Sequence, residues 1–229
     1  MRKAIIAIDG PSGAGKGTIA RAVAAELGYH HYDSGAMYRA IGWKAQRHSV
    51  PFDDEAAVAT LASASKIDIG GTAVSVDDID VTREIRTPAI DRAAAAVARL
   101  PKVREVLVAR QRQLGAAGGI VMEGRDIGTV VFPQADVKIY LDASPEERAR
   151  RRANDPAHNG PAAVAEVATL LTERDRSDRT RTTSPLYAAA DAVIVDTTGK
   201  SVSGVVEEVM AAIRERLRTP ASSPDGFQR

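Results

Sequence analysis

The chain has 229 residues, 44% of them hydrophobic and 27% charged, which is enough to bury one sizeable core with at most a small appended domain. Its 31 basic and 30 acidic side chains leave a formal net charge of +1, which excludes a broad basic field for long nucleic acid or an anionic membrane. The absence of cysteine excludes disulfides and thiolate zinc sites and fits a reducing compartment.

Membrane and metal signals are also missing from the sequence. No run approaches the ~18 uninterrupted apolar residues that span a bilayer. The four histidines lack metal-ligand spacing. We therefore expect a cytoplasmic protein with no nucleic-acid or membrane partner and no protein-bound metal, in which any phosphate-binding charge is local.

The N-terminal region predicts a buried strand followed by a helix. Residues 4–8 form an apolar run rich in isoleucine, which is typical of a strand buried on both faces. Ile19, Val23 and Leu27 then recur every four residues, as on the core-facing stripe of a helix. Gly28 stands where a helix C-cap favours a left-handed residue. Together with the turn between them, these elements form the first half of a βαβ unit.

The turn carries the sequence GPSGAGKGT, residues 10–18. Glycines let backbone N–H groups converge on phosphate oxygens, the helix N-terminus adds positive potential, and Lys16 supplies a cation. The pattern predicts an ATP-binding P-loop, with a ligand-free glycine turn as the alternative. Gly17 moves the usual hydroxyl to Thr18, so Mg²⁺ arriving with ATP is expected near Thr18 or Asp33 through water. The loop residues expected to bind ATP are Gly10, Pro11, Ser12, Gly13, Ala14, Gly15, Lys16, Gly17 and Thr18.

Three further apolar runs, at residues 119–122, 137–141 and 192–195, have the same strand character, and helical patterns separate them. This alternation predicts an α/β fold in which a parallel sheet has helices on both faces. The last helix carries a stripe formed by Val205, Val209, Ile213 and Leu217.

Residues 67–81 break this rhythm, because their apolar residues fall mostly at every second position and paired glycines and aspartates supply turn signals. The pattern predicts a small antiparallel meander. Parallel strands need helical crossovers rather than tight turns, so we interpret residues 61–96 as an insertion into a core formed by 1–60 and 97–217. Residues 218–229 are rich in Pro, Ser and Gly and predict a disordered tail.

Residues 137–142 superficially resemble a Walker B strand that ends in Asp142. The continuation favours a structural role for this aspartate, because Ser144 with Glu147 makes a capping box and Pro145 suits a first helical turn. The NKxD-type and LSGGQ-type motifs of GTPases and transporter ATPases do not occur, so these two classes lose support.

Six segments together resemble bacterial cytidylate kinases, which are P-loop nucleoside monophosphate kinases, and the resemblance runs from residue 5 to about residue 217. The resemblance implies a five-stranded parallel core, a short mobile lid over ATP around residues 148–160, and an insertion in the monophosphate-binding region that fits the meander. The segments are GPSGAGKGT at 10–18, DSGAMYR at 33–39, DVTREIRTP at 80–88, PKVRE at 101–105, EGRDIGTVVFP at 123–133 and ERDRSDRTRTTSPL at 173–186.

Transfer of a phosphoryl group between two nucleotides needs cations around two polyanions. Arginine suits this role because its planar fork binds phosphate bidentately and stays charged, whereas no general base is needed for an acceptor phosphate that is already ionised. By resemblance, the catalytic residues are Lys16, Arg125, Arg152, Arg174 and Arg181. By the same resemblance, CMP binds to Ser34, Tyr38, Arg39, Arg104, Arg125, Asp126, Arg174, Asp178 and Arg181.

Arg174, Asp178 and Arg181 share one face if residues 173–181 are helical. The resemblance implies that this face points into the cleft. The alternative is a solvated helix covered with salt bridges.

Arg148, Arg151 and Arg152 share a helical face and resemble the lid arginines that close on ATP phosphates. Arg151 is accordingly expected to bind ATP. A solvated face is the alternative for all but one or two of the three.

Cytosine differs from uracil by a ring acceptor and an exocyclic amine, so a selective pocket needs an arginine and a carboxylate. The resemblance places Arg104 and Asp126 at these positions. Ala95 stands where the family commonly has a serine, which weakens strict cytosine selectivity, and Glu123 stands where some relatives have Asp.

The sequence thus predicts a monomeric kinase that transfers the γ-phosphoryl of ATP to CMP or dCMP, giving ADP and CDP or dCDP, with Mg²⁺ carried by ATP. A kinase for another small acceptor, such as UMP or shikimate, would keep the P-loop but would not need Arg104 and Asp126. A nucleotide-dependent binding switch with negligible turnover is the third alternative.

Overall fold

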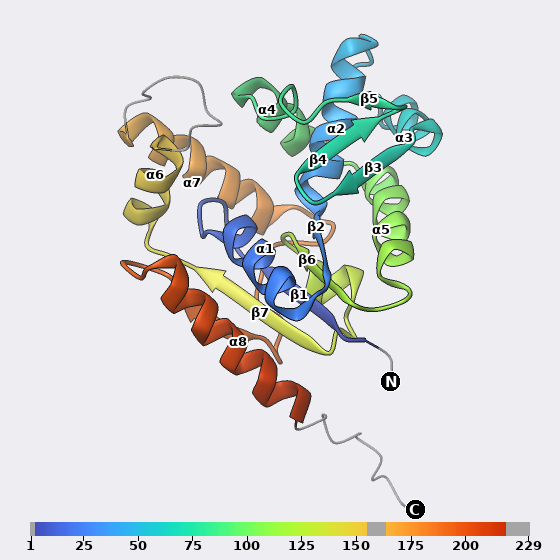
Figure 1. The fold of residues 1–229 in the computed structure, drawn as a ribbon. Helices are drawn as coiled ribbons and strands as arrows, with labels where there is room; N and C mark the ends of the chain where they lie inside the picture. The colour runs from blue at the N-terminus through green and yellow to red at the C-terminus, as the bar shows by residue number, and fades with distance from the viewer. Residues whose placement is uncertain (1–2, 155–163, 219–229) are drawn as a thin grey trace, which may run out of the picture.

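The computed structural model describes residues 3–154 and 164–218. Its main sheet has five parallel strands in the order β2-β6-β1-β7-β8 (Figure 1). The central strand pairs with a neighbour on each side, with Ile6 opposite both Val121 and Val137. The predicted α/β class and the five-stranded parallel sheet are therefore confirmed. The strands are β1 (Ile5–Asp9), β2 (His30–Asp33), β6 (Ile120–Glu123), β7 (Val137–Asp142) and β8 (Val193–Asp196).

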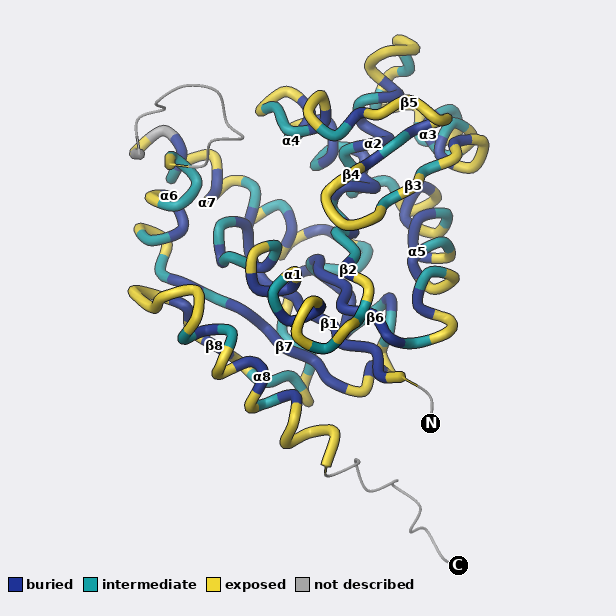
Figure 2. Tube along the Cα trace, in the orientation of Figure 1, coloured by how far each residue is buried: buried dark blue, intermediate teal, exposed yellow. Residues whose placement is uncertain are grey.

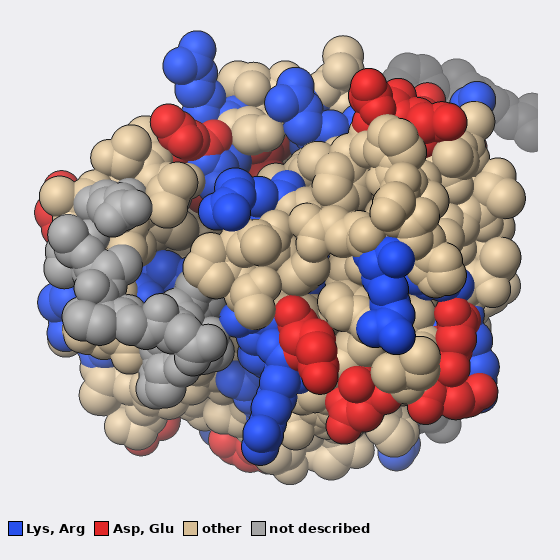
Figure 3. Space-filling model, turned by 90° about the horizontal axis from the view of Figure 1, so that it is seen from above, with Lys and Arg blue, Asp and Glu red and all other residues tan. Residues whose placement is uncertain are grey.

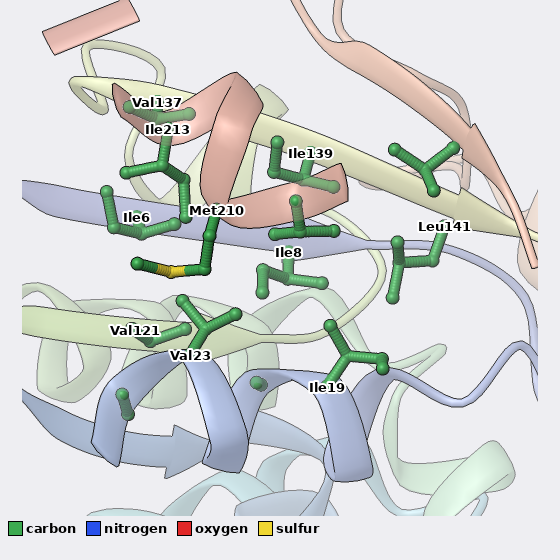
Figure 4. Close-up of a cluster of buried hydrophobic side chains, with 14 of the residues drawn as sticks. Ile6, Ile8, Ile19, Val23, Val121, Val137, Ile139, Leu141, Met210 and Ile213 are labelled. Atoms are coloured by element: carbon green, nitrogen blue, oxygen red, sulfur yellow. The ribbon is translucent and has the colours of Figure 1, made fainter. Parts of the chain in front are cut away.

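Helices cover both faces of this sheet. Ile6 and Ile8 of β1 point to one face, where they pack with α1 (Lys16–Leu27) and α8 (Val202–Arg218) in the cluster drawn in Figure 4. Ile5 and Ala7 point to the other, where α5 (Pro101–Gly115) and a single π-helical turn, η1 (Ile127–Val131), cover them. Burial on both faces explains the uninterrupted apolar run, and β1 and β7 are dark blue in Figure 2.

The sequence patterns did not locate β2, because its residues, His30 to Asp33, are polar or aromatic. It forms an edge of the sheet, and His31 is the one residue of the strand that is buried. The stripe on α8 also stops earlier than its period predicts, since Leu217 is 44% exposed. Gly28 does cap α1 in the left-handed conformation, with φ of 65°.

The predicted meander is a three-stranded antiparallel sheet formed by β3 (Ile67–Gly70), β4 (Ala73–Val76) and β5 (Ile79–Asp80). It packs on α2 (Ser34–Arg47) and α4 (Pro88–Val97), and α3 (Glu55–Ala64) packs beside α2 and α5. We refer to these helices and strands, α2, α3, β3 to β5 and α4, as the small lobe. The small lobe includes α2 and α3, which begin before residue 61. The boundary of the insertion at residues 61–96 therefore remains a prediction from the sequence.

The remaining helices, α6 (Pro145–Ala153) and α7 (Val164–Thr180), pack against each other through Ala149, Val167 and Leu171. Residues 155–160 of the expected lid and 219–229 of the expected tail lie outside the described residues, and Arg218 is the last residue of α8. Among the helices that the structure describes, none has the length and apolarity that crossing a membrane requires.

Candidate active site

The P-loop connects β1 to α1 at the carboxyl end of the central strand. A Cβ at Gly10 would lie 2.0 Å from the carbonyl oxygen of Leu141, and one at Gly13 would lie 2.9 Å from backbone and side-chain atoms of Arg148. Both glycines have positive φ, 147° and 81°. The tight course of this loop around neighbouring backbone therefore requires glycine at these positions.

A buried ion pair supports the loop from behind. Arg148 of α6 pairs with Asp175 of α7, donates to the carbonyl oxygen of Ser12 at 3.1 Å, and donates to that of Ala143 at 3.1 Å. Asp175 also accepts from the backbone N–H of Ser12 at 3.4 Å. Arg148, which the sequence pattern grouped with the lid arginines, thus braces the P-loop and does not line the cleft.

Lys16 is buried at the start of α1, and its Nζ donates to the carbonyl oxygen of Pro11 at 2.7 Å. Burial lowers the pKa of Lys16 to about 7, and repulsion from the Arg125 guanidinium acts in the same direction. Its ammonium thus turns back onto its own loop at a site where positive charge is already concentrated. An anion placed there would favour the charged form.

A polar cleft of about 290 Å³ opens in front of the P-loop. Nine basic and five acidic side chains line it within the described part of the chain, so the local charge is strongly positive although the whole chain is nearly neutral. On the face drawn in Figure 3, basic and acidic side chains are interspersed. The basic ones in the cleft are Lys16, Arg21, Arg39, Arg86, Arg104, Arg125, Arg152, Arg174 and Arg181.

The cleft brings together most of the residues that the sequence singled out. All five expected catalytic residues and all nine expected CMP-binding residues line it, as do Ser12, Gly13, Gly15, Lys16, Gly17 and Thr18 of the P-loop. Gly10, Pro11 and Ala14 are buried behind the loop surface. Arg151 is outside the lining, because it donates to Glu147 of its own helix at 2.8 Å and to Thr197 after β8 at 2.7 and 2.9 Å.

The start of α2 forms the wall of the cleft at the end of β2. Asp33 is the N-cap, accepting from the N–H of Ala36 at 3.1 Å, and its other oxygen pairs with Arg39 at 2.6 Å. The Ser34 hydroxyl donates to the carbonyl oxygen of Glu123 at 2.7 Å, which joins β2 to β6 at their carboxyl ends. The cap thereby fixes where Ser34 and Arg39 enter the cleft.

The far end of the cleft holds a buried pair of opposite charges, Arg104 of α5 and Asp126 after β6. The Arg104 guanidinium also lies over the Tyr38 ring, 5.4 Å from its centroid, and donates to the carbonyl oxygen of Ala98 at 3.2 Å. Arg181 approaches the same carboxylate at 3.7 Å. Arginine and aspartate are thus presented side by side on a small apolar wall that includes Ala95.

The predicted face of α7 is confirmed. Arg174, Asp178 and Arg181 all line the cleft, with Arg181 following the last helical residue, Thr180. Asp178 accepts from Arg125 Nε at 3.0 Å, and the guanidinium groups of Arg125, Arg174 and Arg181 lower its pKa despite the opposing effect of burial. The alternative of a solvated helix is therefore wrong for this face.

Several nitrogen atoms in the cleft are buried without a hydrogen-bond partner in the described part of the chain, namely Nε of Arg39, Nε of Arg104 and Nη2 of Arg181. Buried donors are almost always satisfied in proteins, by protein, water or ligand. These donors belong to side chains expected to meet the acceptor nucleotide. The cleft therefore has the chemistry of an anion site with specific donors rather than of a packed core.

A family model described as "Cytidylate kinase" matches residues 6–215. The chain belongs to the cytidylate kinase family. A cytidylate kinase from Pelotomaculum thermopropionicum is 48% identical over 214 residues, covering 91% of this chain and 95% of that protein. A cytidylate kinase from Solibacter usitatus is 45% identical, covering 95% of each chain. A gluconokinase structure from Sinorhizobium meliloti 1021 has a TM-score of 0.53 at 15% identity, covering 96% of this chain and 99% of that one, a likeness in fold alone.

Four charged residues that line the described part of the cleft in this cytidylate kinase family member carried no expected role: Arg21, Arg86, Asp91 and Glu123. Arg86 lies within a segment that resembles the family, but a charged side chain at this position is equally compatible with a solvent-exposed residue. Asp91 sits in the first turn of α4, where an acidic residue already favours the helix N-terminus. The sequence therefore gave no separate signal for a role in the cleft.

Glu123 was noted only as a departure from some cytidylate kinase relatives. In the structure its Oε1 lies 3.0 Å from Nε2 of the buried His31, and it lines the cleft beside Gly17.

The capping box at α6 is half formed, because the Ser144 hydroxyl accepts from the N–H of Glu147 at 3.2 Å while the Glu147 carboxylate binds Arg150 and Arg151 instead. Asp142 accepts from the N–H of Ala143 at 2.8 Å, outside the cleft.

Proposed function

We propose that this protein transfers the γ-phosphoryl of ATP to CMP, and also to dCMP, forming ADP and CDP or dCDP. The observation that carries this proposal is the common cleft, in which the P-loop lysine, a group of arginines and the Arg104–Asp126 pair face the same cavity. Family membership supports the reaction class. The relatives are named cytidylate kinases, and we take CMP as the acceptor on that basis.

On the donor side, the P-loop N–H groups at the start of α1 and the ammonium of Lys16 bind the ATP phosphates. To do so, Lys16 exchanges its hydrogen bond with the Pro11 carbonyl oxygen for a phosphate oxygen. Arg152 reaches the cleft from α6 and adds a guanidinium beside the transferred group. Arg151 is kept as a proposed ATP contact on the outer side of the loop, where its Nη1 lies 3.6 Å from the Cβ position of Gly15.

The side chains suit a magnesium ion that arrives with ATP. Among the described residues, no cluster of three or more His, Asp or Glu is placed to hold a metal ion. Mg²⁺ usually keeps several waters and takes its remaining oxygens from phosphates and one or two side chains. The Thr18 hydroxyl and, through water, the Asp33 carboxylate would supply these. When bound, the ion would neutralise phosphate charge.

On the acceptor side, Arg39, Arg125, Arg174 and Arg181 hold the CMP phosphate in line with the γ-phosphoryl. Because the acceptor oxygen is already ionised, no side chain removes a proton, and the arginines stabilise charge that spreads over the transferred group. Their orientation is set before substrate arrives, because Asp33 holds Arg39 and Asp178 holds Arg125. Such preorganisation lowers the reorganisation needed at the transition state.

The base of CMP is proposed to lie against Arg104 and Asp126. The guanidinium donates to the ring acceptor of cytosine, and the carboxylate accepts from the exocyclic amine, which uracil lacks. Both side chains are nearly fully buried, at 2% and 5% exposed, so an unmatched base would leave a desolvated group unpaired. The Ala95 side chain cannot form a hydrogen bond with the base, which limits the selectivity for CMP over UMP.

The test is a coupled ADP-release assay with CMP, dCMP, UMP, AMP and shikimate as acceptors. We expect the highest kcat/KM with CMP and dCMP. Stimulation by UMP or AMP far above CMP would reject the assigned acceptor. ATP binding without acceptor-dependent turnover would support a nucleotide-dependent switch instead. Cytoplasmic location and a monomeric state accompany the proposal, and sedimentation of the purified protein checks the latter.

A further inference from the structure

Asp91 lies where three helices meet at the mouth of the cleft. It occupies the first turn of α4, after the N-cap Thr87 and Pro88. Its Oδ2 accepts from Nη2 of Arg152 on α6, and its Oδ1 lies 3.6 Å from Nη1 of Arg174 on α7. A favourable helix dipole explains an acidic residue at this position but does not explain a carboxylate turned onto two guanidinium groups.

These contacts join the two sides of the cleft. α4 packs on α2 as part of the small lobe, whereas α6 and α7 pack together and brace the P-loop through Arg148 and Asp175. In Figure 1, α4 reaches from the small lobe toward α6 and α7. An ion pair with side chains 23% and 15% exposed is only partly screened by solvent. Asp91 therefore contributes an electrostatic link between the acceptor-side lobe and the donor-side helices.

The contacts of Asp91 favour a role in orienting the two arginines rather than in blocking them from substrate. A guanidinium carries five N–H donors, and the contacts with Asp91 take one nitrogen of each arginine. Arg174 is also crowded by Arg125, which with burial lowers its pKa, whereas the Asp91 carboxylate opposes that effect. A carboxylate between the two cations offsets their repulsion, and both arginines still line the cleft.

We propose, building on the proposed function, that Asp91 is a positioning residue: it holds Arg152 and Arg174 toward the phosphoryl-transfer centre and ties the small lobe to α6 and α7. A positioning group of this kind acts mainly on kcat, since it improves the geometry of cations that neutralise charge developing in the transition state. The rival role is a carboxylate that occupies the phosphate sites and competes with substrate.

Kinetics separates the two roles. Asp91→Asn keeps the shape and removes the charge, and we expect kcat to fall about tenfold with the KM values for ATP and CMP changing less than threefold. Asp91→Glu should recover most of kcat. The matched control is Glu84→Gln, an equal charge change at an exposed residue just before α4 and outside the cleft lining. A fall in KM with kcat retained would establish competition, and unchanged kinetics would also overturn the proposal.

A second measurement does not depend on the reaction. Because the chain has no cysteine, spin labels can be attached only where cysteines are introduced, at Arg92→Cys on α4 and Thr172→Cys on α7, both exposed. Without nucleotide, the inter-label distance distribution should become longer and broader when Asp91→Asn is added, and Asp91→Ser should repeat the change. Identical distributions would overturn the link. A lengthened distribution in a protein that fails to phosphorylate CMP would retain the link and reject only the proposed acceptor.

Discussion

Lys16 Nζ donates a 2.7 Å hydrogen bond to the carbonyl oxygen of Pro11, five residues earlier in the same loop. The lysine is buried among cations, and its pKa is lowered to about 7, chiefly by burial. A bound polyphosphate adds negative charge beside the ammonium and raises that pKa again. We therefore expect nucleotide binding to be coupled to protonation of Lys16.

The first prediction concerns the pH dependence of ATP affinity. Below pH 7 Lys16 is already charged, so its protonation adds nothing to the pH dependence. Above pH 7 the free enzyme loses the proton that the complex retains, so the affinity should fall by up to about tenfold per pH unit. Calorimetry at pH 8 in two buffers of different ionisation enthalpy should show an uptake approaching one proton per ATP. Lys16→Arg, whose charge is fixed, should abolish most of that uptake, and zero uptake by the unsubstituted enzyme contradicts the assignment.

The second prediction concerns Arg125, whose Nε is 3.0 Å from Asp178 Oδ2. Arg125→Met removes a guanidinium that we propose contacts the transferred group, and kcat with CMP should fall by about 10³-fold or more. Arg150→Met is the matched control, because Arg150 pairs with Glu147, is 63% exposed in its side chain, and lies outside the cleft lining. Its kcat should stay within twofold of the unsubstituted enzyme. A loss below tenfold for Arg125→Met counts against a transition-state role.

The third prediction concerns base discrimination. Among the described residues, Arg104→Ala leaves the Asp126 carboxylate with the more distant Arg181, and it removes the proposed arginine donor to the base. The ratio of kcat/KM for CMP over UMP should fall about tenfold or more. Thermal unfolding must accompany the assay, because removing one partner of a buried pair costs about 3–5 kcal/mol of stability. Arg104→Lys, which keeps a charge, provides the second variant, and an unchanged CMP:UMP ratio in both would refute the role.

The fourth prediction concerns stability and Asp9, which ends β1 and accepts from the N–H groups of Ile127 and Gly128 at 2.8 and 2.7 Å. Burial raises the pKa of Asp9 from 3.8 to about 6. An acid with a raised folded-state pKa stabilises the protein fully below its unfolded-state pKa, and this stability is lost as the pH rises through 6.

From these two pKa values the loss between pH 5 and pH 8 is roughly 1.4 kcal/mol. Urea unfolding of the unsubstituted protein and of Asp9→Asn at both pH values should show their difference in unfolding free energy shifting by that amount. Subtracting the variant removes the contribution of the other titrating groups. A constant difference would show that the raised pKa is absent.

Much of the fold was readable from the sequence, because burial on both faces of a parallel sheet leaves long apolar runs. Residues 4–8, 119–122, 137–141 and 192–195 each predicted a strand that starts within one residue of the observed one. β2 gave no such signal, since an edge strand that feeds the cleft can be polar. The side chains of β2 are mostly exposed or half-buried, so they did not have to be apolar.

Some of the site residues were likewise identified from the sequence, and others were not. By itself the sequence determined the P-loop, since the phosphate-binding conformation depends on glycines in a strand-to-helix turn, and it determined which arginines share one face of α7. Only the tertiary structure decided which arginines reach the cleft. Arg148, Arg151 and Arg152 are equal in sequence character, yet Arg148 is buried against Asp175, Arg151 is held by Glu147 and Thr197, and Arg152 meets Asp91. Their partners lie on separate elements, and the positions of those elements depend on packing between distant segments, which no local pattern encodes.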